Sequence, residues 1–99
     1  MIRHIVAFTL AAEDPAVRAE QAAEAARQLN ALLGVVPTLR TMTAGANTLA
    51  LGTNWDLALV ADFDDEAGLD AYQVHPQHQE VVAYIGSIRK ERIAVDFEL

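Results

Sequence analysis

The segment Asp70-Ala-Tyr-Gln-Val-His-Pro-Gln-His78 concentrates the side chains of this sequence that are able to exchange protons. It contains two of the three histidines and one of the two tyrosines. A neutral imidazole accepts protons near neutral pH, and a tyrosine hydroxyl donates a hydrogen bond to such a base or to a substrate oxygen. Tyr72 and His78 are therefore a candidate acid/base pair.

Pro76 determines how this segment is arranged. Proline suits the first turn of a helix and biases the residue before it toward extended backbone. The sequence predicts a helix that ends near Tyr72, a break at His75 and a second helix that starts at Pro76. This arrangement turns Tyr72 and His78 toward one space and leaves His75 to cap a helix end. The alternative is a plain helix junction in which both histidines have only capping or surface roles.

The composition indicates one acidic domain over residues 1–99. Single hydrophobic cores commonly occupy about 100 to 150 residues. Apolar residues make up 53% of the chain but aromatic residues only 6%, so Ala, Val, Leu and Ile must build the core. A small chain this apolar favours an oligomer. The formal net charge of −7 repels phosphate backbones and acidic lipids, so we expect neither nucleic acid nor a membrane as a partner.

Two further features concern the cellular compartment. The absence of cysteine excludes disulfides, thiolate metal sites and a cysteine nucleophile. The opening Met-Ile-Arg-His-Ile-Val lacks the pattern of a secretory signal, and no apolar run is long enough for a membrane span. We therefore expect a cytoplasmic protein.

Hydrophobic periodicity predicts the elements around this segment. Alternation over 2–10 indicates a strand that carries His4, Val6 and Phe8 on its more apolar face. Asp14 with the proline after it predicts a helix from residue 14 to about residue 33, and Gly34 is placed for a left-handed cap. A short strand is predicted over 38–43, and a turn over 44–47.

The second half of the chain follows the same logic. The clearest central strand covers 55–63, with Leu57 and Leu59 on its apolar face. Helices are predicted over 64–73 and from 76 to 85 or 87, and a closing strand over 91–97. This order predicts an α+β, ferredoxin-like βαββαβ fold with a four-stranded antiparallel sheet and helices on one face. A second copy packed sheet against sheet would cover the other face and form a dimeric α/β barrel.

Several segments together carry a family resemblance over essentially the whole chain. They are Ile2-Arg-His-Ile-Val-Ala-Phe8, Gly34-Val-Val-Pro37, Gly45-Ala-Asn47, Trp55-Asp-Leu-Ala-Leu-Val60 with Phe63, Tyr72-Gln-Val-His-Pro-Gln-His78 and Val95-Asp-Phe97. Their order and spacing resemble the stress-responsive dimeric α/β barrel (Dabb) family. The resemblance implies a ferredoxin-like fold, a homodimer through the sheets and a cavity between sheet and helices.

Within this family, the Tyr-x-x-His-Pro-x-His spacing resembles polyketide cyclases of the olivetolic acid cyclase type, which close a ring by aldol condensation. This resemblance implies His78 as general base and Tyr72 as its hydrogen-bonding helper, and His4 matches an early strand histidine of those enzymes. The chain departs from them at Leu57, where they carry another pocket histidine, and near Ala25, where they carry a tyrosine.

The predicted site joins the catalytic pair Tyr72 and His78 to a set of substrate-binding residues. That set consists of His4, Val6, Phe8, Leu57 and Leu59. The expected ligand is a small apolar, aromatic or polyketide-like molecule, and no cofactor is expected. The sequence leaves open whether the protein is an enzyme. It favours a small-molecule-binding dimer that acts as a cofactor-independent cyclase or lyase on a polyketide-like carbon acid.

Three alternatives use the same cavity. A non-catalytic, stress-responsive dimer would bind a small apolar metabolite there without turning it over. A dimeric-barrel monooxygenase, free of cofactor or handling heme, is an alternative by analogy of fold. A metal site formed by His4, His75 and His78 is the third, but no further ligand is fixed near them in sequence, so we expect no bound metal.

Overall fold

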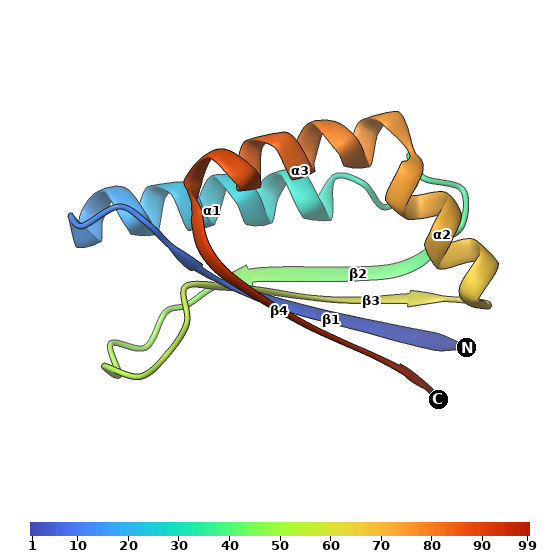
Figure 1. The fold of residues 1–99 in the computed structure, drawn as a ribbon, viewed down its shortest axis with the longest axis horizontal. Helices are drawn as coiled ribbons and strands as arrows, with labels where there is room; N and C mark the ends of the chain where they lie inside the picture. Colours follow the sequence, from blue (N-terminus) through green and yellow to red (C-terminus); the bar gives the residue numbers. More distant parts are fainter.

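One antiparallel four-stranded sheet carries all the helices on a single face (Figure 1). The computed structural model describes residues 1–99. Its strands are β1 (Ile2–Leu10), β2 (Leu39–Ala46), β3 (Leu57–Phe63) and β4 (Arg89–Glu98), and its helices are α1 (Pro15–Asn30), α2 (Glu66–Val74) and α3 (Pro76–Ile88). The strand order is β2-β3-β1-β4. This is the predicted ferredoxin-like arrangement, with its second helical segment divided into α2 and α3.

Helix α1 begins as predicted and ends earlier than predicted. The Asp14 carboxylate accepts a backbone hydrogen bond in the first turn. The helix stops at Asn30 rather than near Leu33, and the Asn30 side chain makes two hydrogen bonds of 2.9 and 3.0 Å with the backbone of Ala44. Gly34 has the expected left-handed backbone, with φ of +89°, but it lies in the turn after the helix.

Strand β2 extends through a segment for which the sequence predicts a turn. Residues 44–46 pair with 57–59 of β3, so the loop between the two strands starts only at Asn47. Alanine and glycine have weak strand preference, but hydrogen bonding to a central strand outweighs local preference. The prediction of a turn over 44–46 was therefore wrong.

Strand β3 begins at Leu57, two residues after the predicted start at Trp55. The Asp56 carboxylate accepts a hydrogen bond from the Leu10 backbone N–H at 2.8 Å and lies 3.3 Å from the Arg18 guanidinium. These contacts fix Asp56, the last residue of the loop between β2 and β3, against β1 and α1.

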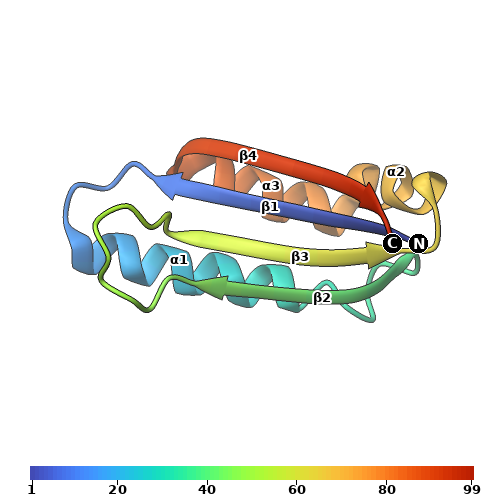
Figure 2. The same ribbon diagram turned by 90° about the horizontal axis from the view of Figure 1, so that it is seen from below.

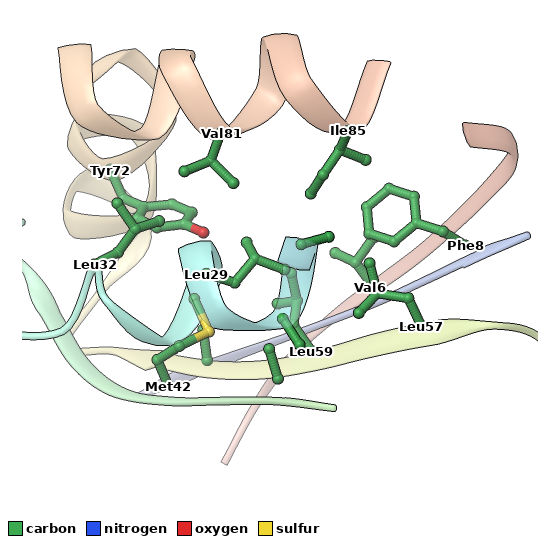
Figure 3. Packing of buried hydrophobic residues seen from close by; sticks show 14 of the residues in the cluster. Val6, Phe8, Leu29, Leu32, Met42, Leu57, Leu59, Tyr72, Val81 and Ile85 are labelled. Atoms are coloured by element: carbon green, nitrogen blue, oxygen red, sulfur yellow. The ribbon is translucent and has the colours of Figure 1, made fainter. Parts of the chain in front are cut away.

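The core lies between the sheet and the helices. Figure 3 shows side chains of β1, β3, α1 and α3 meeting in this layer, among them Val6, Leu29 and Ile85. Ala22 and Ala25 of α1 are buried and let this helix approach the sheet closely. None of the helices combines the length and apolarity needed to cross a membrane.

The opposite face of the sheet has no cover within the chain (Figure 2). The register places Val95 beside Ile5, which lies beside Val60 across three strands. Val95 is 54% exposed, and Ile93 and Phe97 are exposed on the same side of β4. We call these five apolar residues the open sheet face. Apolar side chains gathered on an uncovered sheet face in this way mark an interaction site.

Candidate functional site

A cavity of about 300 Å³ opens between the sheet and helix α3. Its apolar walls come from Val6, Phe8, Leu29, Leu59, Val81, Val82 and Ile85, and its polar side chains are those of His4, Tyr72, Gln73, His78, Gln79, Arg89 and Arg92. Apolar walls with a few convergent polar groups are the usual form of a small-molecule site. This cavity is therefore the candidate functional site.

Three elements bring His4, Tyr72 and His78 to this cavity. The ring centroids of Tyr72 and His78 are 4.0 Å apart, with the planes tilted by 40°. The His4 ring meets Tyr72 edge-on at 6.4 Å. The break between α2 and α3 makes this possible, because Tyr72 precedes it and His78 stands in the turn that follows it.

His75 forms that break and does not line the cavity. Its backbone is extended, with φ of −64° and ψ of 134°, as expected for a residue before proline. Its Nδ1 accepts a hydrogen bond of 3.1 Å from the Gln77 backbone N–H, which caps α3. The capping role predicted for His75 is thus observed.

His78 is held with one ring nitrogen free to accept a proton. Its Nδ1 lies 3.2 Å from the Gln73 carbonyl oxygen. Since a carbonyl only accepts hydrogen bonds, Nδ1 donates and the lone pair resides on Nε2. Partial burial lowers the pKa of His78 below its ordinary value, and this outweighs the opposing effect of the Gln73 bond. The imidazole is therefore neutral at neutral pH and able to act as a base.

His4 is oriented by an acidic partner on the neighbouring strand. The register places His4 of β1 opposite Asp96 of β4, and the Asp96 carboxylate contacts His4 Nδ1. The His4 side chain is almost completely buried, whereas Asp96 is exposed. A carboxylate that accepts from one imidazole nitrogen fixes the ring and its tautomer. Sequence reasoning missed Asp96, because strand register is not visible in either strand alone.

Tyr72 does not make the hydrogen bond to His78 that the resemblance implies. The two rings lie in tilted contact instead, and the Tyr72 hydroxyl is buried without any hydrogen-bond partner. Figure 3 shows this hydroxyl pointing toward Leu29, between α3 and the sheet. Burial raises the pKa of Tyr72 well above its ordinary value, so the hydroxyl stays protonated. It is a donor that no protein group uses.

The apolar residues predicted for the site divide between cavity and core. Val6, Phe8 and Leu59 line the cavity, as the sequence predicts. Leu57 does not line it, although it belongs to the same core cluster as these three residues. The placement of Leu57 in the site is therefore a correction.

The sequence reasoning also missed several lining residues. Val81 and Ile85 are spaced four residues apart on α3, which identifies a buried face of the helix. This spacing does not show whether that face packs against the core or lines a cavity. Arg89 and Arg92 lie near the junction of α3 and β4 and carry no motif. The metal site considered for the histidines is not formed, because no three potential ligands among His, Asp and Glu converge.

Replacing Tyr72 with phenylalanine should not destabilise the protein. The hydroxyl has no partner in the core, so its removal relieves a desolvation penalty and should leave the melting temperature equal or higher. Thermal denaturation of Tyr72→Phe checks this, with Tyr84→Phe as a control outside the cavity. A fall of about 5 °C or more, roughly 1 kcal/mol for this size, would mean that the hydroxyl has a partner in the folded protein.

The fold and the cavity define a ferredoxin-like α/β protein with a site between sheet and helices. The chain belongs to the family described as the Stress responsive A/B Barrel Domain, whose model matches residues 2–99. The predictions of family and fold are confirmed. The finer resemblance to polyketide cyclases stays a prediction. Among curated proteins, none matches the chain in sequence.

Solved structures with the same fold cover nearly the whole chain. A dimeric ferredoxin-like protein of unknown function from Thermobifida fusca is 37% identical, with a TM-score of 0.81 over 99% of this chain and 90% of that one. A dimeric protein of unknown function from Bacteroides fragilis is 25% identical, with a TM-score of 0.89 over 99% and 95%. A hydroxynitrile lyase from Passiflora edulis, at 13% identity and a TM-score of 0.77 over 97% and 90%, shares the fold.

Proposed function

We propose that the cavity binds a small apolar carbon acid and that His78 removes a proton from it as a general base. The main observation behind this proposal is a neutral imidazole whose Nε2 is free and which lines an apolar cavity. A positioned general base with a pKa near the working pH contributes about 10²- to 10⁴-fold to a rate. Because a fold hosts many reactions, the proposal depends on this site and not on the activities of similar structures.

In the proposed reaction, His78 takes the proton from a carbon that lies between two carbonyl groups. The C–H bond breaks, an N–H bond forms at Nε2, and the electron pair moves onto the carbonyl oxygen as an enolate. The Tyr72 hydroxyl, which is buried beside the cavity and has no protein partner, would donate a hydrogen bond to this developing charge once the substrate opens a path to it. His4, whose ring is oriented by Asp96, lies beside the Tyr72 ring and offers the substrate a second polar contact.

Ring closure follows if the substrate carries another carbonyl group. The enolate carbon attacks that carbonyl, a C–C bond forms, and the imidazolium of His78 returns the proton to the new alkoxide. The apolar walls from β1 and α3 would fold a flexible chain and exclude water. Holding reacting carbons in contact supplies a large part of such a rate enhancement. The reaction class is therefore an aldol-type cyclisation, and the protein acts as a lyase without a cofactor.

The working unit in this proposal is a homodimer. Similar structures from Thermobifida fusca and Bacteroides fragilis are described as dimeric. The open sheet face of this chain supplies the apolar surface that such an assembly needs. A second copy packed on it would complete the dimeric α/β barrel.

Hydrogen exchange at carbon tests the proposed chemistry directly. Linear β-polyketo thioesters of N-acetylcysteamine would be incubated with the protein in D₂O and followed by proton NMR. We expect exchange at the carbon between the carbonyls to exceed the protein-free rate by about 10²-fold or more, followed by a cyclised product. Binding of these compounds without exchange above background would leave a non-catalytic, metabolite-binding dimer as the function.

A further inference from the structure

The cavity carries a charge pattern opposite to that of the whole protein. The chain has 14 acidic against 7 basic residues and a net charge of −7. None of the residues that line the cavity is an aspartate or a glutamate, whereas two of them, Arg89 and Arg92, are arginines. The cavity lining thus carries two arginines and no carboxylate, and the nearby Asp96 carboxylate is engaged by His4, which favours a negatively charged occupant.

The cavity arginines differ from the others in having no carboxylate partner. The other arginines each form an ion pair, namely Arg3 with Asp62, Arg18 with Asp56, Arg27 with Glu24 and Arg40 with Asp64. The remaining basic residues are Arg89, Lys90 and Arg92, and none of them pairs with an acidic side chain. Guanidinium groups without a carboxylate partner are free to bind an anion.

Strand geometry directs Arg92 to the cavity. It lies opposite Phe8 in the β1–β4 register and so shares the face of the sheet that carries His4 and Val6. Its positive charge is among the causes that lower the pKa of His78, which places the guanidinium within electrostatic range of that imidazole. Arg92 and the proposed base His78 therefore line the same cavity.

Arg89 occupies the junction where α3 passes directly into β4 (Figure 1). Both Arg89 and Arg92 are exposed and line the cavity, so they form its rim, while the buried apolar side chains form its interior. Lys90 stands between them in sequence but does not line the cavity. The chain thus contains its own control, an unpaired cation on the same strand that faces elsewhere.

We propose that Arg89 and Arg92 bind an oxyanion of the ligand at the rim of the cavity. The ligand class is then an amphipathic anion, with an apolar or aromatic body in the interior and a carboxylate or phosphate group at the rim. Arginine suits this task because its planar fork matches both groups. The inference rests on the proposed function, since it concerns the ligand of the same cavity, but its test measures binding and not turnover.

Calorimetric titrations with octanoate, octyl phosphate and octanamide test this inference. The three probes share one apolar chain and differ in charge. We expect at least one anion to bind about tenfold or more tightly than octanamide, with an affinity that falls as salt is added. Arg92→Gln and Arg89→Gln should each lower the affinity for that anion by about three- to tenfold and leave the affinity for octanamide unchanged. Lys90→Gln should change neither the affinity for the anion nor the affinity for octanamide. Thermal melts check that all three variants fold.

The comparison of anions identifies the source of the bound group. If octanoate binds more tightly, the anionic group of the ligand is the carboxylate of an acid. If octyl phosphate binds more tightly, it is the phosphate of a phosphorylated carrier. Both results support the proposal. Octanamide that binds as tightly as the anions, equal losses in Lys90→Gln, or no binding by any probe would each overturn it. Anion binding that persists without carbon–hydrogen exchange would reject the proposed function and leave this inference standing.

Discussion

We expect His78→Ala to lower turnover of an accepted carbon acid by about 10²- to 10⁴-fold, almost to the uncatalysed background. Alanine removes the Nε2 lone pair that the Gln73 hydrogen bond keeps free. The nearby His4 does not replace it, because its buried ring is held by Asp96 on another strand. The measurement is the ratio of product formed by the variant to product formed without protein.

Two matched variants separate chemistry from folding. His75→Ala removes the α3 cap and should cost about 1 kcal/mol of stability while leaving turnover unchanged. Tyr72→Phe removes one hydroxyl, keeps the ring that shapes the cavity and should lower turnover less than His78→Ala. If a folded His78→Ala protein kept wild-type turnover, histidine-base catalysis would be rejected and the metabolite-binding function would take its place.

The same prediction fixes the direction of the pH dependence. Only neutral imidazole accepts the proton, so kcat/KM should rise with pH through the free-enzyme pKa of His78. Burial is the main cause that holds this pKa below 6.5, so the half-maximal point should lie on the acid side of that value. Because the pKa of His78 is lower in the folded protein, the unfolded chain binds the imidazole proton more readily. The free energy of unfolding is therefore not reduced by His78 above pH 6.5 and falls as the pH drops below that value.

The fold was predictable where the alternation of one strand or the cap residue of one helix was enough to locate that element. Alternation in β1 placed His4 and Val6 on the buried face, and the Asp14 cap located the start of α1. The error over 44–46 came from small residues whose strand state depends on pairing with β3. Local preference is a weak guide when hydrogen bonding to a distant strand decides the outcome.

The site was predictable only where its residues lie close together in sequence. Proline geometry at 76 was enough to turn Tyr72 and His78 toward one space. Asp96 and Arg92 reach the site through the register of β4 against β1, which no pattern within β4 specifies. Leu57 was misplaced for a related reason: its strand face was correct, but no pattern within β3 says which part of that face borders the cavity.

The largest expected effect on assembly is that of Val95→Glu on the open sheet face. In the proposed dimer, Val95 and its neighbour Ile5 lie between two sheets, in an interface of roughly 2,000 Å² or more. An unpaired buried charge costs about 3–5 kcal/mol, which corresponds to a dimer Kd raised by about 100-fold or more. Analytical ultracentrifugation at micromolar concentration should find the wild type dimeric and the variant dissociated or unfolded.

The control for this experiment must add the same charge elsewhere, because the chain already carries −7. Val17→Glu does so on an exposed position of α1, away from the sheet, and should remain dimeric. If Val17→Glu dissociated as readily as Val95→Glu, net repulsion and not the sheet would control assembly. A wild-type chain that sediments as a compact, folded monomer would reject the dimer outright, since its apolar open sheet face would then be stable in water.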